Sequence, residues 1–491
     1  MSRKNKKIKK RFRIFSTIIW IILSVATLYF SFNIFKTDMI PDKYLIIGGI
    51  AILSLIVLTG FLTISRKSGV KTFIIVDIIM ILFISMYLFA GNKINVVYNF
   101  LENNLGIKYK TNIYNVAVKV DSEFNSLSDI EGKTIIYFDD SKEESQLVNE
   151  IKEKIKNANI TKGNDMNTAL VKITQDPNYI VIVNSGNYDA MTGIDEEYYN
   201  KTKIIATIEI KKEIEEEKNQ NIEQKQDITN NPFVVYISGI DTRSGKLPNR
   251  SLTDVNIIMA VNPKTKKVLM VHIPRDMYVK VPGKQGARDK LTHLGTIGGV
   301  EMTMEAIEDL VDINFSYYIR LNFNSVIKLV DAIGGIDVYS DVNYKFNAYN
   351  LPSLTIYPLQ MNHLNGNEAL AFAKERHAYV TGDRHRGENQ EQVIQRIIEK
   401  MSSSTKLLTK SNEILKALEG TFETNISANE ISELVKMQLD DMAKWKVEIY
   451  NINGTSALDY TYSYPNQQLY IMHADTATIT EAKKKLDEFS N

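Results

Sequence analysis

Three long apolar runs occur near the N-terminus, separated by short polar segments. They cover Ile14–Phe35, Tyr44–Ile64 and Thr72–Ala90. Each has about 20 residues, which is the length that an α-helix needs to cross a hydrocarbon core of about 30 Å. A cleaved signal peptide would explain only the first run, and the two runs that follow favour three retained membrane helices over buried helices of a soluble domain.

Basic residues are distributed unevenly around these runs. Eight Lys or Arg residues lie within the first thirteen positions, and Arg66, Lys67 and Lys71 lie between the second and third runs. The loop at 36–43 instead has two Lys balanced by two Asp. Because cytoplasmic loops are enriched in Lys and Arg, we expect a cytoplasmic N-terminus and everything after about Ala90 outside the cell.

Short strand-like and helix-like patterns alternate between residues 92 and 210. Thr134–Phe138 and Tyr179–Asn184 are rich in β-branched and aromatic residues, and Lys142–Asn157 has helical spacing with mixed charge. This alternation predicts a small α/β accessory domain, and no recognisable chemistry lies in it.

The segment 211–231 consists mainly of Glu, Lys, Gln and Asn and has hardly any large apolar residue. It cannot bury a core, so it predicts a solvated helix or a flexible linker. We therefore expect few contacts between the accessory domain and the part that follows, and independent folding of residues 232–491.

A longer alternation of strand and helix patterns begins at about residue 232. Strand patterns cover Phe233–Ile240, Val255–Asn262, Lys267–Ile273, Tyr317–Leu321 and Ile336–Tyr339, and helical patterns cover Met302–Val311 and Asn324–Ala332. The alternation predicts an α/β sandwich with a central, mostly β-sheet core flanked by helices. The predicted chain is thus α/β: a basic tail with three transmembrane helices (1–91), an accessory domain (92–210), a linker (211–231) and a main domain (232–491).

The overall composition excludes several classes of protein. The chain has 59 basic and 58 acidic side chains and a net charge of +1, which argues against a nucleic-acid partner. It has no cysteine, so disulfides, thiolate zinc sites and iron–sulfur clusters are excluded. The sequence also has no Walker loop, no His-Glu-x-x-His and no Gly-x-Ser-x-Gly motif.

Arginines are distributed unevenly in a chain whose basic residues are mostly lysine. None occurs from Lys67 through Thr242, and nine follow, at positions 243, 250, 275, 288, 320, 376, 384, 386 and 396. A planar guanidinium binds phosphate oxygens through two parallel hydrogen bonds, which a lysine ammonium cannot do. The pattern favours a polyanionic ligand, and structural ion pairing is the alternative explanation.

Some of these arginines lie directly after predicted strands, beside aspartates. Asp241 and Arg243 follow the first strand of the main domain, Arg275 and Asp276 follow the third, and Asp254 opens the strand between them. Loops at strand ends are where α/β sheets build ligand sites, so we expect these residues to meet. Carboxylates beside arginines would suit a divalent cation that bridges a diphosphate.

A further charged cluster begins the last long helical pattern of this region. Arg386 and Gln390 continue the apolar face of that helix, which is formed by Val393, Ile394, Ile397, Ile398 and Met401. Polar groups on a buried face need partners, and at the positive end of a helix they would form an anion site. Arg396 falls on another face and is expected to face solvent, and His377 and His385 are expected to be loop residues rather than metal ligands.

These clusters, in this order, resemble the LytR-CpsA-Psr family over roughly residues 233–473. The matching motifs are Gly239-Ile-Asp241-x-Arg243, Thr253-Asp254, Ile273-Pro-Arg275-Asp276, Leu364-Asn-Gly-Asn-Glu-Ala-Leu370, Glu375-Arg376 and Gly382-Asp383-x-x-Arg386 with Asn389-Gln390. The three membrane helices and the accessory domain are most similar to the CpsA-like branch of the family, which acts on capsule and wall polymers.

The resemblance implies a phosphotransferase that uses Mg²⁺. It would transfer a polyprenyl-diphosphate-linked anionic glycopolymer, either capsular polysaccharide or teichoic acid, onto peptidoglycan through a phosphodiester. It implies that Asp241 and Asp254 hold the magnesium ion or act as the base, and that Asp383 orients the arginines. The implied catalytic set is Asp241, Asp254, Arg275, Arg376 and Asp383, and the implied diphosphate ligands are Arg243, Arg275, Lys374, Arg376, Arg386 and Gln390.

The sequence departs from the family pattern at a few of these positions. Lys374 and Leu252 stand where arginine is frequent, and Asn389 and Glu391 replace the commoner residues of the last motif. Two other functions use the same donor site: a non-catalytic protein that binds or organises lipid-linked glycans, and a pyrophosphate hydrolase that releases the polymer. In each case we expect a multi-pass protein of the cell membrane of a Gram-positive-type bacterium, in contact with membrane lipid.

Overall fold

The computed structural model describes residues 3–65, 67–104, 109–139, 141–195, 197–213, 227–240, 242, 247–402, 413–414, 418 and 420–490. The chain divides into two compact units. The membrane unit comprises Met1–Gly106, Thr405–Lys416 and Ile426–Lys444, and the larger unit comprises Ile107–Ser404, Ala417–Asn425 and Trp445–Asn491.

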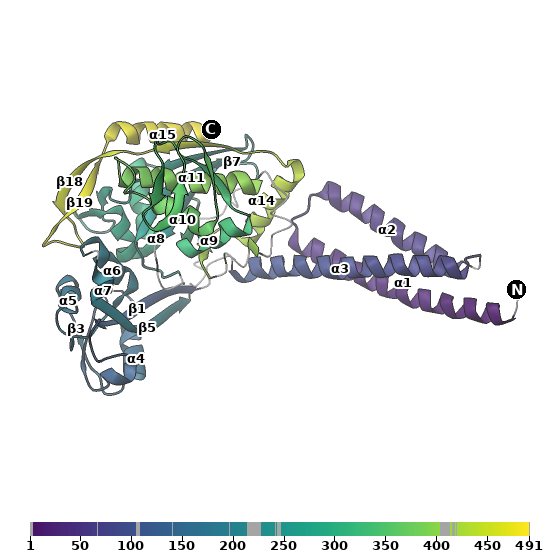
Figure 1. The fold of residues 1–491 in the computed structure, drawn as a ribbon, viewed down its shortest axis with the longest axis horizontal. Coiled ribbons are helices and arrows are strands. Elements are labelled where there is room, and N and C mark those ends of the chain that lie inside the picture. The colour runs from purple at the N-terminus through teal and green to yellow at the C-terminus, as the bar shows by residue number, and fades with distance from the viewer. Residues whose placement is uncertain are drawn as a thin grey trace. The chain divides into compact units, whose positions relative to one another are not determined.

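Three long helices form most of the membrane unit: α1 (Arg3–Thr37), α2 (Asp42–Ile64) and α3 (Val70–Asn104). All three are long and apolar enough to cross a membrane, as predicted. α1 and α3 lie side by side (Figure 1), and their contact buries Leu23 and Met80. α3 continues to Asn104, so the predicted boundary at residue 92 lies inside this helix.

One helix from late in the chain belongs to the same unit. α14 (Ala428–Asp441) begins with a capping box between Ser427 and Glu430. Lys436 of this helix lies 3.0 Å from Asp38 and 3.1 Å from Asp42, and Asp440 lies 2.9 Å from Lys43. These ion pairs join α14 to the polar segment between α1 and α2.

The residues predicted to form the accessory domain build a five-stranded mixed sheet with the order β3-β2-β4-β1-β5. Its strands are β1 (Tyr109–Lys119), β2 (Thr134–Tyr137), β3 (Asn159–Lys162), β4 (Val181–Asn184) and β5 (Thr202–Glu213). The helices are α4 (Glu144–Lys154), α5 (Met166–Lys172), α6 (Ser185–Ala190) and α7 (Tyr198–Lys201), with short 3₁₀ turns η1 (Leu127–Ile130) and η2 (Met191–Gly193). β5 includes the first three residues of the predicted linker, and residues 214–226 lie outside the described ones.

A six-stranded mixed sheet with the order β16-β11-β6-β7-β8-β17 forms the centre of the main domain. Its strands are β6 (Phe233–Ile240), β7 (Thr253–Asn262), β8 (Lys267–His272), β11 (Tyr317–Asn322), β16 (Phe422–Thr424) and β17 (Lys446–Asn451). β6 pairs antiparallel with β7 and parallel with β11, so that Ile237 lies between Ile257 and Ile319. Six of the eight residues of β6 are buried, as expected of a strand covered on both faces.

Helices cover both faces of this sheet. They are α8 (Leu291–Val311), α9 (Phe323–Ala332), α10 (Gly366–Lys374), α11 (Asp383–Ser402) and α15 (Thr476–Ser490). Tyr236, Ile258 and Val271 pack against α8 and α15 on one face, while the alternate residues Val235 and Ile237 are buried on the other. α11 contacts β8 and α10, and α10 packs against α9 (Figure 1).

Short antiparallel pairs complete the main domain. They are β9 (Tyr278–Lys280) with β10 (Arg288–Lys290), β12 (Ile336–Tyr339) with β15 (Met361–Leu364), β13 (Phe346–Ala348) with β14 (Leu351–Ile356), and β18 (Gly454–Tyr460) with β19 (Gln468–Ala474). α8 starts eleven residues before the predicted helix, because a kink at Gly299, with φ of 75°, joins two helical segments.

The accessory part and the main domain share a hydrophobic core, so the expectation of few contacts between them was wrong. Tyr464 and Leu469 pack with Leu170, Tyr188 and Tyr198 in one buried cluster. The backbones also meet, since the amide of residue 249 donates to the carbonyl of residue 111 at 2.7 Å. The linker composition carried no information on this contact, because the apolar side chains that form it come from segments far apart in the sequence.

Candidate active site

Most of the predicted site residues lie around one cleft of about 450 Å³ in the larger unit. Its lining includes five cationic side chains, those of Arg275, Lys290, Lys374, Arg376 and Arg386. Asp254, Asp276 and Gln390 lie among them. A cleft with this charge is suited to a ligand with several negative oxygens.

The antiparallel pairing of β7 and β8 explains how two distant motifs meet. The first residues of β7 lie beside the residues that follow β8, so Asp254 and Arg275 are neighbours. Nη1 of Arg275 donates to Oδ1 of Asp254 at 2.6 Å, and Nζ of Lys290 lies 2.6 Å from Oδ1 of Asp276. Each carboxylate thereby holds one cation of the cleft in place.

The two aspartates are kept ionised by their surroundings. Burial alone would raise the pKa of the Asp254 carboxyl, but Arg275, Arg386 and Lys374 outweigh it and lower this pKa. The pKa of Asp276 is also lowered, because Arg275 and Lys290 outweigh the effect of burial. Both groups are therefore anionic at neutral pH, the form that can accept a proton or bind a metal.

α11 presents its first turns to the cleft. Arg386 and Gln390 line the cleft, and Gln390 is buried, so they lie on the inward face that the apolar stripe predicted. The side chain of Arg396 is 29% exposed and donates to Glu399 at 2.7 Å. The expectation that Arg396 faces solvent was therefore wrong, because Glu399 in the next turn holds the guanidinium against the helix.

Both explanations of the arginine pattern apply in the structure. Arg275, Arg376 and Arg386 line the cleft. Arg320, in contrast, is 2% exposed and pairs with Glu423 at 2.9 Å, and Arg250 lies 3.8 Å from Asp139 of the accessory part. These last two arginines serve the fold.

A second cavity of about 290 Å³ shares residues with the first. The shared residues are Asp254, Arg275, Asp276, Arg386 and Gln390. Ile452 and Met472 contribute apolar surface to this second cavity. The cations can therefore be approached from a polar side and from a partly apolar side, which fits an amphiphilic ligand.

His272 is a residue of this second cavity that the sequence analysis did not identify. It is buried, and a Cβ atom on Gly387 of α11 would lie only 2.4 Å from its ring carbon Cε1. Burial and the charge of Arg386 lower the pKa of His272 to about 4, so its imidazole is neutral. The only sign of this contact in the sequence is a glycine inside a helical pattern.

Lys290 was also missed, because it is the last residue of a short strand, β10, that has no recognisable motif. Three predicted residues cannot be placed: Asp241 and Arg243 lie outside the described residues, and so does the side chain of Asp383. The backbone of Asp383 starts α11. The other predicted residues, Asp254, Arg275, Lys374, Arg376, Arg386 and Gln390, all line the cleft.

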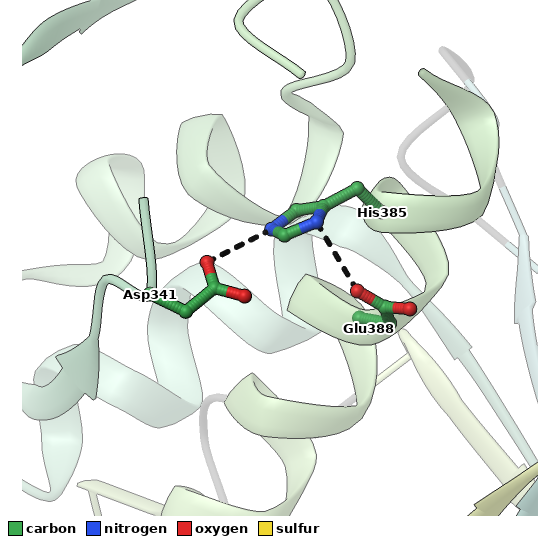
Figure 2. Close-up of side chains that lie close together, drawn as sticks. All are labelled: Asp341, His385 and Glu388. Carbon is green, nitrogen blue, oxygen red and sulfur yellow. Dashed lines mark ion pairs between the residues drawn. The ribbon is translucent and has the colours of Figure 1, made fainter. Parts of the chain in front are cut away.

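Among the described residues, one His–carboxylate cluster has a spacing that could hold a metal ion: Asp341, His385 and Glu388. Figure 2 shows the imidazole between the two carboxylates. Nε2 of His385 lies 3.4 Å from Asp341, and Nδ1 lies 3.1 Å from Glu388. Because each nitrogen faces a different carboxylate, the imidazole bridges the two acidic side chains.

His385 also differs from its predicted place. It lies in α11 and not in a loop, and its ring stacks on Tyr379 with 3.6 Å between centroids. His377 does lie between α10 and α11, where it lines the cleft beside Arg376. The apolar stripe of α11 starts at Val393, eight residues after His385, so it did not indicate that His385 lies in the helix.

Comparison with known proteins places the chain in a family. Residues 198–487 match the LytR_cpsA_psr family. The chain belongs to the LytR-CpsA-Psr family, as the resemblance implied.

Relatives of the chain have names that describe an activity. Over 258 residues the chain is 33% identical to the "Polyisoprenyl-teichoic acid--peptidoglycan teichoic acid transferase TagU" of Bacillus subtilis (strain 168), which covers 52% of this chain and 78% of the relative. It is 31% identical over 234 residues to the protein of the same name from Enterococcus faecalis, covering 48% of this chain and 74% of the relative.

Solved structures match about half of the chain. The crystal structure of B. subtilis TagU is 30% identical, with a TM-score of 0.40, and covers 53% of this chain and 97% of that chain. B. subtilis TagV is 28% identical, with a TM-score of 0.43 and the same coverage. The helices and mixed sheets of the chain, together with the family match, confirm the predicted α/β fold class with three apolar helices ahead of a domain of this family.

Proposed function

We propose that the protein is a membrane-anchored phosphotransferase that transfers a polyprenyl-diphosphate-linked glycopolymer onto peptidoglycan. The observation that carries this proposal is the cleft in which five cations surround the ionised Asp254. The transferase names of the relatives support the same reaction. Teichoic acid, named in those relatives, and capsular polysaccharide are the two polymer classes that this proposal includes.

The cations bind and orient the donor. Arg275 is fixed by Asp254, and Lys290 is fixed by Asp276, so the diphosphate would meet charges that are already in position. Positioning and charge neutralisation supply most of the rate enhancement in phosphoryl transfer. The same cations would stabilise the negative charge that develops on the departing polyprenyl phosphate.

The reaction balances without any further reactant. A hydroxyl oxygen of the acceptor sugar attacks the phosphorus that carries the glycopolymer, and the bond from this phosphorus to the bridging oxygen breaks. Polyprenyl phosphate leaves, and the polymer remains attached to the acceptor through a phosphodiester. The hydroxyl proton passes to an aspartate, for which the ionised Asp254 is suited and Asp241 is the other predicted candidate.

The resemblance also implies Mg²⁺, and the described residues fit this ion. Asp254 offers an ionised oxygen ligand beside the expected diphosphate, and hard oxygen ligands are what Mg²⁺ prefers. When bound, the ion would neutralise part of the diphosphate charge. Asp254 and Asp241 are the two residues that would hold the ion or accept the proton.

The reaction would take place outside the cell, beside the membrane that contains the donor. The basic N-terminus and the basic second loop favour a cytoplasmic location for both. The ion pairs of Lys436 with Asp38 and Asp42 support three crossings, in either orientation. They require the first loop to lie on the same side of the membrane as the C-terminal part of the chain, and three crossings give that arrangement.

A product assay tests the proposal. The full chain in lipid nanodiscs would be supplied with a polyprenyl-diphosphate-linked polymer, peptidoglycan fragments and Mg²⁺. We expect polymer covalently attached to peptidoglycan and an equal amount of released polyprenyl phosphate. Polymer released as a free phosphate ester would identify a hydrolase, and tight donor binding without any product would identify a binding protein. Either result would overturn the transferase.

A further inference from the structure

One wall of the cleft comes from the accessory part of the chain. It consists of Asp189, Ala190, Thr192, Gly193 and Tyr199, which lie on α6, η2 and α7. All of these except Tyr199 precede the segment 198–487 that matches the family. The accessory wall, as we call these five residues, therefore adds this chain's own side chains to the site that the family motifs define.

The accessory wall is held in place by buried contacts. The backbone of α6 lies against the main domain so closely that a Cβ atom on Gly186 would be 2.9 Å from the carbonyl oxygen of Arg250. Behind the wall, Tyr188 packs edge-on against Tyr198, with 5.2 Å between ring centroids. Both belong to the core shared with Tyr464. A wall fixed at this precision can discriminate between ligands.

The chemistry of the accessory wall differs from that of the facing side. The facing side has five cations, whereas the wall offers a carboxylate, a hydroxyl and a phenol. The hydroxyl of Tyr199 donates to Oδ1 of Asp189 at 2.7 Å, which orients the carboxylate. A carboxylate repels phosphate and accepts hydrogen bonds from neutral hydroxyl groups. The wall is therefore suited to a part of the ligand that is uncharged and rich in hydroxyls.

We propose that Asp189, Thr192 and Tyr199 bind the sugar ring next to the diphosphate and thereby select the saccharide that is transferred. The inference rests on the proposed function, in which a diphosphate occupies the facing cations. A cleft of about 450 Å³ lies within the roughly 300–1,000 Å³ of small-ligand sites. The donor and the acceptor both present sugar hydroxyls, so the experiment has one arm for each.

The donor arm measures binding to the full chain in nanodiscs without acceptor. The two probes are polyprenyl diphosphate without a sugar and the same lipid carrying N-acetylglucosamine. We expect Asp189→Asn and Tyr199→Phe each to weaken binding of the sugar-bearing lipid by about tenfold, because each removes or misorients a hydrogen-bonding group. Binding of the sugar-free lipid should stay within about twofold of wild type.

The acceptor arm measures the KM for peptidoglycan fragments with the same variants. A tenfold rise in this KM, with donor binding unchanged, would assign the wall to the acceptor sugar. Asp195→Asn is the matched control, because Asp195 pairs with Lys201 at 2.7 Å and does not line the cleft. Tyr199→Phe removes one oxygen atom only, so it remains informative if Asp189→Asn lowers the melting temperature.

The outcomes separate the two proposals. If the variants change neither sugar-bearing donor binding nor the acceptor KM, while the sugar-free lipid binds normally, the accessory wall does not select sugars and the diphosphate site stands. If wild-type protein binds neither lipid, the proposed function fails, and this inference fails with it.

Discussion

At the scale of single residues, the arginines divide into those that face the cleft and those that hold the fold. Arg275 and Arg386 lie in the cleft, whereas Arg320 is enclosed by Glu423 and backbone carbonyls. All three share one chemistry, so their residue type alone cannot separate them. What separates them is the neighbouring element: a strand end or a helix start for the first two, and the middle of a buried strand for Arg320.

Arg275→Ala should lower polymer transfer by about ten- to a hundredfold. Loss of a charge-assisted contact to phosphate costs about 1.5–3 kcal/mol. Arg275→Lys should restore only part of the rate, because an ammonium cannot form a bidentate contact. The measurement is initial transfer rate at saturating Mg²⁺, with melting temperatures recorded for each variant.

Arg288→Ala is the matched control for this experiment. Arg288 is exposed, lies outside the cleft and contacts Tyr278 of its own β-pair. Its transfer rate should stay within about twofold of wild type, since surface changes usually stay within ±0.5 kcal/mol. If Arg275→Ala folds and keeps wild-type activity, the diphosphate does not bind at Arg275.

Glu391→Gln should stabilise the protein and make its free energy of unfolding less dependent on pH. Glu391 is 1% exposed, and burial raises its pKa to about 9 from an ordinary value of 4.5. Between these two pH values the unfolded chain has lost the proton that the folded chain keeps, so stability falls as pH rises through this window. At pH 7 the effect is up to ~3 kcal/mol.

The measurement for Glu391 is urea unfolding of the wild type and the variant from pH 5 to pH 9. The two free energies of unfolding should be close at pH 5 and diverge as the pH rises. Parallel curves across this range would show that Glu391 does not titrate inside the folded protein as its burial implies.

At the scale of elements, short α6 decides how the accessory part meets the main domain. It starts directly after β4, where the side chain of Asn184 accepts from the backbone of Gly186 at 3.0 Å. A glycine is required at position 186 because the backbone at Arg250 and Ser251 leaves no room for a side chain. The backbone angle φ at Gly186 does not itself require a glycine. Two residues after Ser251 the chain enters β7, whose second residue, Asp254, lines the cleft.

Gly186→Val should therefore destabilise the contact between α6 and the main domain. Forcing a side chain into a packed interface costs about 1–3 kcal/mol. We expect a lower melting temperature and faster amide exchange in residues 185–190. Gly193→Ala is the control for stability, because a Cβ there meets nothing within 4 Å. Equal melting temperatures for the two variants would show that α6 does not pack closely.

At the scale of the whole molecule, the proposed orientation can be tested by labelling introduced cysteines. The natural chain has no cysteine, so each introduced cysteine is the only one that can be labelled. Lys67→Cys lies in the basic second loop and Glu131→Cys in the accessory part, and both positions are exposed. A membrane-impermeant maleimide added to intact cells should label Glu131→Cys and leave Lys67→Cys unlabelled. Labelling of Lys67→Cys before cell lysis would show that the second loop lies outside the cell and that the proposed orientation is wrong.

The sequence by itself determined the elements whose signals are local. The apolar runs predicted three membrane helices, and the strand Phe233–Ile240 has the same bounds in the structure. Asp254, Arg275 and Arg386 were predicted from their residue types and from their places at the ends of elements, and Arg376 was implied by the family resemblance. All four line one cleft. These signals act over a few residues, so they can be read along the chain.

Only the tertiary structure decided which distant segments meet. The accessory wall, the shared core around Tyr464 and the neutral His272 beneath Gly387 depend on side chains separated by tens to hundreds of residues. Neither the amino-acid composition of a segment nor the spacing of its apolar residues predicts such a contact, because each partner alone has the character of an ordinary core or surface residue. The protein therefore has a cleft in which four of the five cations belong to sequence motifs, whereas the opposite wall forms only on folding.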